Sequence, residues 1–305
     1  MSETENKGPT RAGFVAVVGA PNVGKSTLVN RMVGAKVSIV SPKVQTTRTR
    51  VLGICMAGLS QIVLIDTPGI FQPKRRLDRA MVHAAWSGAT EADVVMLLVD
   101  AKRGLDEDTR NILDRLKADR RHGLILVLNK VDIAKKPDLL ALAQQLFDTG
   151  MFAETFMVSA ETGDGVGDLT AYLAARLPEG PWLFPEDEVS DMPQRLLAAE
   201  ITREQLYHQL RQELPYAATV ETETWTEQKD GSVRIEQAIL VERDSQKPIV
   251  LGKGGSRIKS LGQASRAELE TLLERKVHLF LFVKVKQNWG EESERYRDLG
   301  LDFNA

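Results

Sequence analysis

The sequence contains one cysteine and no long apolar run, and these two absences exclude whole classes of protein. A single cysteine, Cys55, cannot form an intrachain disulfide, which argues against a disulfide-stabilised secreted fold and suits a reducing cytoplasm. No apolar stretch approaches the ~20 residues that a membrane-spanning helix needs. Residues 2–7 are polar and lack the apolar region of a signal peptide, so we interpret residues 1–12 as a disordered tail.

A strong net charge is also missing, because the 305 residues carry a formal net charge of only −2. Such a balance does not indicate nucleic-acid binding, so any RNA site must be a local basic patch. The length allows two domains with their own hydrophobic cores. The 43% hydrophobic and 27% charged content is ordinary for a globular protein and does not predict a disordered or fibrous chain.

Residues 19–26 carry the first nucleotide-binding motif, Gly-x-x-x-x-Gly-Lys-Ser. The motif follows an apolar run at residues 14–18 and precedes a helical pattern that starts at Thr27, which is the strand–loop–helix context that a P-loop requires. Its glycines and backbone N–H groups can surround phosphate oxygens. We expect Lys25 to reach the β- and γ-phosphates and the Ser26 hydroxyl to bind Mg²⁺.

A second motif, Asp-Thr-Pro-Gly at residues 66–69, follows another apolar run at residues 62–65. An aspartate at the end of a strand beside a P-loop is the usual second Mg²⁺ anchor, so Asp66 is predicted to fill this role. The N–H of Gly69 is a candidate donor to the γ-phosphate.

Between these motifs, residues 45–48 read Gln-Thr-Thr-Arg. A threonine here would join the magnesium shell when GTP is bound and leave it after hydrolysis. We favour Thr47 over Thr46, although the sequence leaves both open.

Two later loops predict guanine recognition. Residues 129–132 read Asn-Lys-Val-Asp after a third apolar run, and the Asp132 carboxylate can accept hydrogen bonds from the guanine ring N–H and exocyclic amine. Adenine lacks that donor pair, so Asp132 is expected to select GTP over ATP. The backbone of Ser159-Ala160, after a fourth run, is expected to donate to the guanine carbonyl.

The order of patterns along the chain predicts two domains. Strand-like runs alternate with helical patterns to about Leu177, which predicts an α/β domain over residues 13–180, with a mostly parallel sheet and helices on both faces. A segment rich in proline and acidic residues, 181–193, is interpreted as a linker. The remaining residues, 194–305, are predicted to form an α+β domain with helices near 194–212 and 261–273 and strands near 219–226, 233–241 and 277–285.

The C-terminal part contains Gly252-Lys253-Gly254-Gly255, a Gly-x-x-Gly loop of the kind that joins two helices in KH domains and clamps single-stranded nucleic acid. The predicted order, helix–strand–strand–helix–loop–helix–strand, matches a type II KH domain. Trp289 could stack on a base or plug the end of the domain, and Lys284 and Lys286 could extend the basic patch or form a solvated strand edge. Predicted RNA contacts are Ile249, Val250, Gly252, Lys253, Gly254, Gly255, Arg257, Ile258 and Lys259.

The motifs resemble those of P-loop GTPases of the translation-factor-related class, and within it the Era family of bacterial ribosome-assembly GTPases. Gly-x-Pro-Asn-Val-Gly-Lys-Ser, Gln-Thr-Thr-Arg and Ser-Ala-Glu-Thr-Gly carry the likeness in the first half. Leu214-Pro215-Tyr216, Ile239-Leu240-Val241-Glu242-Arg243 and Val277-His278-Leu279 carry it in the second. The resemblance spans nearly the whole chain and implies a P-loop GTPase domain followed by a type II KH domain.

The resemblance also implies a function. It implies a GTPase that binds the 3′ end of 16S ribosomal RNA and acts in assembly and maturation of the 30S subunit. We expect Mg²⁺ and GTP or GDP as ligands, a monomeric state, and a cytoplasmic location with peripheral association at the cytoplasmic face of the cell membrane. Two alternatives are a nucleotide-stabilised RNA scaffold and a GTPase that serves RNA-modification enzymes, and no modification motif supports the second.

One catalytic element is missing from the motifs. Ras-type enzymes carry a water-orienting glutamine after Asp-x-x-Gly, whereas Ile70 and Phe71 follow Gly69 here. We therefore expect slow intrinsic hydrolysis, with Lys25, Thr47, Gly69 and Asn22 as the catalytic candidates. Asn22 would help to bind K⁺ near the phosphates, or would only shape the loop. The predicted nucleotide-binding residues are Gly19, Ala20, Pro21, Asn22, Val23, Gly24, Lys25, Ser26, Thr27, Asp66, Thr67, Pro68, Gly69, Asn129, Lys130, Asp132, Ser159 and Ala160, with Ser26, Thr47 and Asp66 at the metal.

Overall fold

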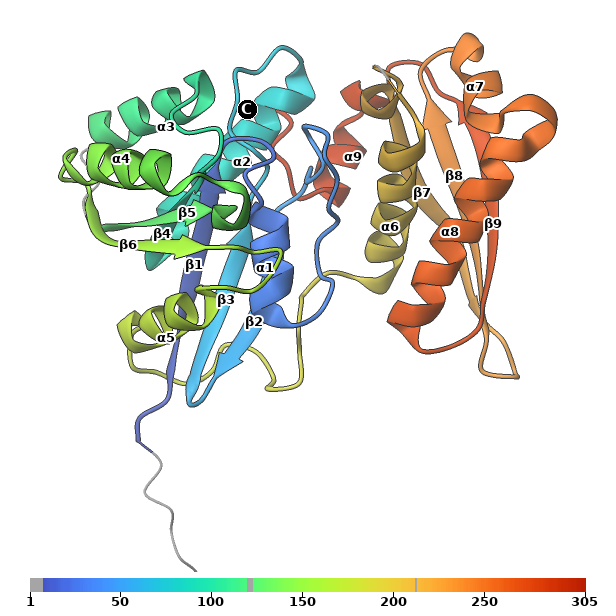
Figure 1. Cartoon of the computed structure of the whole chain (residues 1–305). Coiled ribbons are helices and arrows are strands. Elements are labelled where there is room, and N and C mark those ends of the chain that lie inside the picture. Colours follow the sequence, from blue (N-terminus) through green and yellow to red (C-terminus); the bar gives the residue numbers. More distant parts are fainter. Residues whose placement is uncertain (1–7, 120–122, 212) are drawn as a thin grey trace, which may run out of the picture. The chain divides into compact units, whose positions relative to one another are not determined.

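Two β-sheets organise the chain, each within its own compact unit (Figure 1). The computed structural model describes residues 8–119, 123–211 and 213–305. The first unit comprises residues 1–38, 47–191 and 299–305, and the second comprises 39–46 and 192–298. These units are defined by packing and do not test the domain limits predicted from the sequence, 13–180 and 194–305, which stay predictions.

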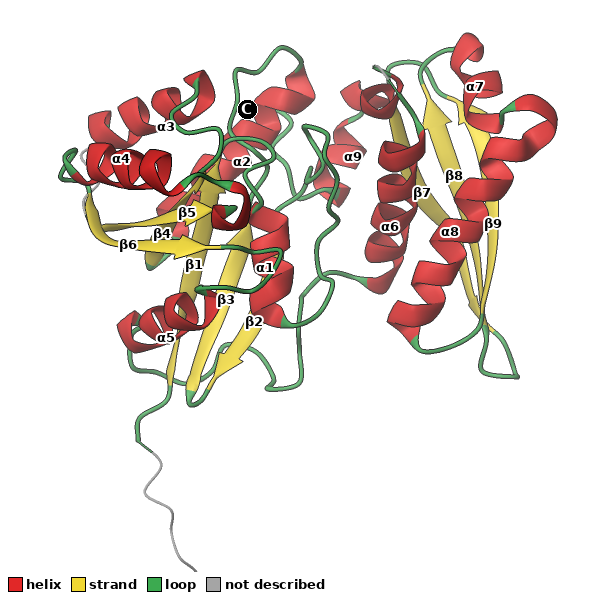
Figure 2. Cartoon of the chain, viewed as in Figure 1, coloured by secondary structure: helices red, strands yellow, loops and turns green. Residues whose placement is uncertain are grey.

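The first unit is an α/β layer structure built on a six-stranded sheet (Figure 2). The strand order is β2-β3-β1-β4-β5-β6, and every neighbouring pair is parallel except β2 and β3. Its strands are β1 (Arg11–Gly19), β2 (Val51–Ala57), β3 (Ser60–Asp66), β4 (Val94–Asp100), β5 (Leu124–Asn129) and β6 (Phe152–Val158). Its helices are α1 (Lys25–Val33), α2 (Arg76–Glu91), α3 (Glu107–Ala118), α4 (Lys136–Phe147) and α5 (Val166–Arg176), with a 3-10 turn at Val131–Ile133.

Helices cover both faces of this sheet, as the uninterrupted apolar runs of β4 and β5 require. Gly53 of β2 lies against Val29 and Val33 of α1, whereas Ile65 of β3 lies against Gly88 of α2. Gly53 pairs with the residue before Ile65, and successive strand residues point to opposite faces, so α1 and α2 lie on opposite sides. The predicted α/β fold class, with a mostly parallel sheet, is confirmed.

The second unit is a three-stranded sheet, β7-β8-β9, with helices packed on it. Strands β7 and β8 are antiparallel, and β8 and β9 are parallel. The elements are α6 (Gln194–Gln209), β7 (Ala218–Glu227), β8 (Val233–Val241), α7 (Lys247–Leu251), α8 (Ser256–Leu273), β9 (Val277–Val285) and α9 (Ser293–Asp298), with 3-10 turns at Leu214–Ala217, Asp244–Gln246, Lys253–Gly255 and Trp289–Glu291. This order matches the type II KH arrangement that the sequence predicts. The predicted helix to residue 212 ends at Gln209, and residue 212 itself lies outside the described residues.

The segment between the predicted domains is held along β3 and β2. The Gln61 side chain is fully buried, accepts hydrogen bonds from the N–H groups of Leu183 and Phe184, and donates one to the Phe184 carbonyl. Further along, the N–H of Ile54 donates to the carbonyl of Val189 at 2.9 Å. Residues 183–189, predicted as part of a linker, therefore belong to the fixed structure of the first unit.

The start of the chain is also more ordered than the sequence predicts. Residues 1–7 of the predicted tail lie outside the described residues. Residues 10–12, by contrast, are bonded in place, because Thr10 exchanges hydrogen bonds with Gly180 and β1 begins at Arg11. Within the described ranges, every helix is too short or too polar to cross a bilayer.

We predict that Gln61→Leu lowers the free energy of unfolding by about 2 kcal/mol. The change removes the hydrogen-bond partner of three backbone groups, the N–H groups of Leu183 and Phe184 and the carbonyl of Phe184. Urea unfolding followed by far-UV circular dichroism measures this difference. Gln145→Leu, at an exposed position of α4, is the matched control and should change stability by less than ~0.5 kcal/mol. An equal loss in both variants would contradict the role of Gln61.

Candidate nucleotide site and RNA loop

The nucleotide motifs meet at one edge of the six-stranded sheet. In the parallel register Asp66 aligns with Val17 near the end of β1, and Asp100 aligns with Asn129. Because β1, β3, β4, β5 and β6 run in one direction, the loops that follow them emerge at the same edge. Open parallel sheets bind ligands at this carboxyl edge.

The P-loop encloses the ammonium group of Lys25. The Nζ atom donates to the carbonyls of Gly19 and Ala20, each at 3.0 Å, and burial lowers the pKa of Lys25 to about 8, with Asp66 opposing the shift. The group therefore stays largely protonated near pH 7. Gly24 has φ of 98°, and a Cβ there would lie 2.3 Å from Nδ2 of Asn129, so only glycine fits. Ala20 and Val23 pack into the core and contribute backbone alone.

Hydroxyl groups surround the buried carboxylate of Asp66. Ser38 and Ser26 donate to its Oδ2 at 2.6 and 2.7 Å, and Ser26 Oγ lies 2.8 Å from Thr47 Oγ1. Burial raises the pKa of Asp66, while the hydrogen bonds from the serines oppose that rise. Among the described residues, Asp66 Oδ1 has no hydrogen-bond partner. A buried carboxylate oxygen without a partner beside two further hydroxyls is an oxygen set that fits Mg²⁺.

The two candidate threonines lie in different surroundings. Thr46 Oγ1 donates to the Lys43 carbonyl at 2.7 Å and lies 2.6 Å from Ser41 Oγ, inside its own loop. Thr47 Oγ1 instead faces Ser26 and the carboxylate of Asp66. The geometry therefore favours Thr47 as the threonine of the predicted magnesium site.

Sequence reasoning missed Asn30 and Ser38. The Asn30 side chain accepts hydrogen bonds from the N–H groups of Val37 and Ser38 and donates to the Ser38 carbonyl at 2.7 Å. Asn30 thus fixes the backbone that carries the Ser38 hydroxyl to Asp66. An asparagine inside a helical pattern gives no sequence signal for such a role, because its partners are defined only by the fold.

Asn129 links the P-loop to the guanine loop. Its Nδ2 donates to the Val23 carbonyl at 2.8 Å, and its Oδ1 accepts from the Ala160 N–H at 2.9 Å. The N–H of Ser159 donates to the Asp164 carbonyl. Both backbone donors that the sequence assigns to the guanine carbonyl are thus already engaged within the protein. Asp132 lies exposed in the 3-10 turn after β5.

Lys130 is held by Asp100, the last residue of β4. Its Nζ lies 2.7 Å from Asp100 Oδ2 and donates to the Asn22 carbonyl at 2.7 Å. Asp100 also accepts from the N–H groups of Lys102 and Arg103, so it serves as turn residue and as ion-pair partner. The link between β4 and the P-loop through Lys130 is a tertiary contact without a sequence motif.

The loop after β3 is tied to the P-loop by its backbone. A Cβ on Gly69 would lie 2.9 Å from Pro21 Cα, and the N–H of Ile70 donates to the Gly19 carbonyl at 3.1 Å. Thr67, predicted to contact nucleotide, points inward and donates to the Val17 carbonyl. Ile70 is buried, so the side chain that follows Gly69 cannot orient a water molecule.

The Gly-x-x-Gly loop lies between α7 and α8, as predicted. Gly254 and Gly255 have φ of 59° and 76°, with open space where a side chain would begin. Gly252 is constrained instead by packing, because a Cβ there would lie 2.8 Å from the Arg257 backbone N. The loop therefore presents bare backbone to the solvent, next to the exposed Lys253 and Lys259.

Other predicted RNA contacts divide by burial. Ile249 is 49% exposed, Ile258 is half-buried, and Val250 is fully buried in the core, so Val250 cannot touch a base. Trp289 is buried and donates to the Ala217 carbonyl, which makes it a plug. Lys284 and Lys286 pair with Glu223 and Glu292, so their charges are compensated on the surface.

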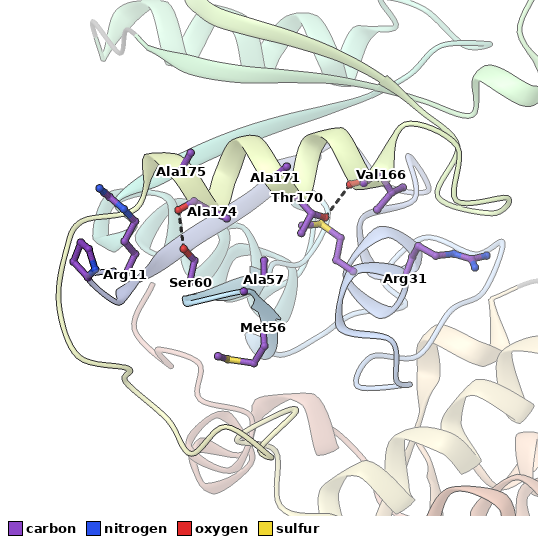
Figure 3. A pocket seen from close by; sticks show the side chains of 14 residues that line it. Arg11, Arg31, Met56, Ala57, Ser60, Val166, Thr170, Ala171, Ala174 and Ala175 are labelled. Carbon is purple, nitrogen blue, oxygen red and sulfur yellow. Dashed lines mark hydrogen bonds between the residues drawn. The ribbon is translucent and has the colours of Figure 1, made fainter. Parts of the chain in front are cut away.

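A separate hollow of about 700 Å³ lies between α1, the β2–β3 turn and α5 (Figure 3). Its lining includes Met56, Ala171 and Ala174, and none of the predicted nucleotide-binding residues. The side chain of Arg31, at its rim, extends away from it. The hollow is thus distinct from the nucleotide site.

Two family descriptions match the two halves of the chain. A family described as "50S ribosome-binding GTPase" matches residues 14–130, and a KH domain family matches residues 213–290. Among solved structures, the chain is similar to Era in complex with MgGDPNP and nucleotides 1506–1542 of 16S ribosomal RNA, with a TM-score of 0.90, 39% identity, and coverage of 95% of this chain and 99% of that one. An Era variant from Aquifex aeolicus bound to GDP and aluminium fluoride matches with the same values.

Curated relatives match along the full length. The chain is 61% identical to GTPase Era of Rhizobium meliloti (strain 1021), over 97% of this chain and 94% of that protein. It is 58% identical to GTPase Era of Caulobacter vibrioides (strain NA1000 / CB15N), over 100% of both proteins. With this identity over nearly its whole length, the chain belongs to the Era family of GTPases.

Proposed function

We propose that this GTPase is a switch that binds the 3′ end of 16S ribosomal RNA through its KH domain and acts in assembly and maturation of the 30S subunit. The observation that carries the proposal is the Gly-x-x-Gly loop, whose bare backbone and flanking lysines suit single-stranded RNA. The solved relative that binds 16S nucleotides is similar over 95% of this chain, which supports the same ligand here. The phrase "50S" belongs to the description of a GTPase family that matches residues 14–130. It gives no information about the RNA ligand of the KH domain, which matches at residues 213–290.

In the proposed site, Ser26, Thr47 and Asp66 would hold Mg²⁺, and the ion would supply positive charge beside the phosphates. Lys25 would exchange its bonds to the P-loop carbonyls for phosphate oxygens, and the Gly69 N–H would donate to the γ-phosphate. Asp132 would accept from the guanine ring. With Ile70 in place of a water-orienting side chain, intrinsic hydrolysis is slow and depends on an outside stimulus.

The proposed switch runs through a continuous piece of chain. Ser38 and Thr47 face Asp66 and Ser26, and the eight residues between them, 39–46, belong to the second compact unit. In that unit the Val40 N–H donates to Glu204 at 2.7 Å, and Arg203 donates to the Thr46 carbonyl. Any shift of Ser38 or Thr47 on hydrolysis would therefore be transmitted through the backbone to α6.

The proposed site of action is the cytoplasm, where ribosomes assemble, and the protein acts as a monomer. Peripheral association with the cytoplasmic face of the cell membrane is part of the proposal through family resemblance. Co-sedimentation with vesicles made from the host's lipids tests the membrane part separately.

We predict that a short RNA matching the 3′ end of 16S ribosomal RNA raises GTP turnover by about fivefold or more in potassium buffer, because RNA bound to the second unit would favour one position of residues 39–46 and so of Thr47 at the proposed metal site. Gly254→Asp should abolish both RNA binding and stimulation, since it adds a Cβ and a negative charge where RNA backbone would approach. Phosphate release and fluorescence anisotropy measure the two effects.

Gly231→Asp is the matched control for this experiment. Gly231 also has positive φ, 81°, and open space around it, but it lies in the β7–β8 turn. It should leave RNA binding unchanged. RNA binding without any change in turnover would instead favour a nucleotide-stabilised scaffold.

We also predict that GTP turnover is several-fold faster in K⁺ than in Na⁺ at matched ionic strength, because K⁺ is larger and sheds its water more readily, and would therefore fit beside the phosphates and neutralise their charge where Na⁺ would not. Asn22→Gly should remove this difference while it preserves the loop, since Asn22 has φ of 63° and glycine adopts that conformation readily. Equal rates of the wild-type protein in the two salts would exclude the cation.

A further inference from the structure

Arg31 lies in the last turn of α1, the helix that begins with Lys25 and Ser26, and reaches the loop after β6. Its Nε donates to the Ala160 carbonyl at 3.1 Å, and its Nη2 donates to the Glu161 carbonyl. We propose that Arg31 is a positioning residue for guanine recognition, which orients the peptide between Ala160 and Glu161 so that its N–H faces the base. The inference rests on the predicted role of the Ser159-Ala160 backbone in binding guanine and extends it to the N–H of Glu161.

The orientation follows from peptide geometry. Peptide bonds in the described chain are trans, and in a planar trans peptide the N–H points opposite to the C=O. With the Ala160 C=O directed at Arg31, the Glu161 N–H points away from α1. The two preceding donors, on Ser159 and Ala160, are engaged by Asp164 and Asn129. The Glu161 N–H has no acceptor among the described residues, so it is available as a donor to the guanine carbonyl.

Ala160 is held from two directions. Asn129 accepts from the Ala160 N–H through Oδ1 and donates to the Val23 carbonyl of the P-loop through Nδ2. Arg31 takes its C=O and connects it to α1. The bond from the Ala160 N–H fixes the peptide before this residue, and the bond to its C=O fixes the peptide after it. Arg31 also donates to the successive carbonyls of Ala160 and Glu161 from one planar guanidinium group, a geometry that a lysine cannot reproduce.

The consequence is a contribution to base selectivity that separates from that of Asp132. Replacing the guanine carbonyl oxygen by sulfur, as in 6-thioguanosine diphosphate, weakens the bond to the loop 159–161 only. Removing the exocyclic amine, as in inosine diphosphate, weakens the bond to Asp132 only. Binding of the two analogues therefore measures the contact with the loop 159–161 and the contact with Asp132 separately.

The experiment compares the wild-type protein, Arg31→Met and Arg31→Lys in the full-length chain by competition with a fluorescent GDP. We expect Arg31→Met to weaken GDP binding by about threefold to tenfold, since the arginine is exposed and its bonds are partly replaced by water. The preference for GDP over 6-thioguanosine diphosphate should fall by a similar factor, and the preference over inosine diphosphate should stay unchanged. Arg31→Lys should recover part of the loss, and kcat should change little while KM rises.

Arg176→Met is the matched control, because Arg176 is an exposed arginine of the same unit that stacks on Tyr172. It should bind all three nucleotides as the wild type does. An unchanged preference over 6-thioguanosine diphosphate in Arg31→Met would overturn the positioning role, as would an equal loss of both preferences. If the wild-type protein did not distinguish GDP from inosine diphosphate, the guanine site itself would be wrongly placed, and the roles of Asp132 and Arg31 would fall together.

Discussion

The nucleotide site depends on two opposite charges that are buried at one edge of a sheet. Lys25 and Asp66 are both buried. Burial lowers the pKa of Lys25 and raises the pKa of Asp66, so it disfavours the charged form of each. Such burial is costly unless the groups are paired or hydrogen-bonded. The P-loop carbonyls partly satisfy the ammonium, and serine hydroxyls partly satisfy the carboxylate. A phosphate and a divalent cation bring the two opposite charges that would complete both shells. The loops at 19–26, 37–47 and 66–70 supply the groups that surround these two charges.

Strong local patterns predicted the fold, and tertiary contacts set its details. The strands β8 and β9 were predicted to the residue, because they are apolar runs between clear turn signals. Strand β2 was not predicted, since Gly53 weakens its pattern and its partner β3 lies beyond a turn. Helix α8 begins at Ser256, five residues before the predicted start, because the glycines that precede it are a helix boundary rather than a long loop.

The candidate site shows the same division. The motif residues gather as the sequence predicts, because strand ends in a parallel sheet must share an edge. The supporting residues Asn30, Ser38 and Asp100 were missed or left without a role, since each acts on a backbone group that only the fold brings near. Val250 was misplaced because a short apolar run does not tell which residue faces a groove and which the core. Motifs thus predict which residues contact the ligand, and the structure shows which residues hold those motifs in place.

The chain passes between its two compact units four times, at residues 38/39, 46/47, 191/192 and 298/299. The units are therefore not independent modules joined end to end. A fragment that begins at residue 192 would lack residues 39–46. In the full chain these residues form hydrogen bonds with Arg203, Glu204 and Tyr207 of α6. Arg203 is only 1% exposed, so the cut would uncover a charge that the fold buries. An exchange between genes that moved residues 192–298 into another protein would therefore leave behind residues 39–46 of the same compact unit, because these are encoded far upstream.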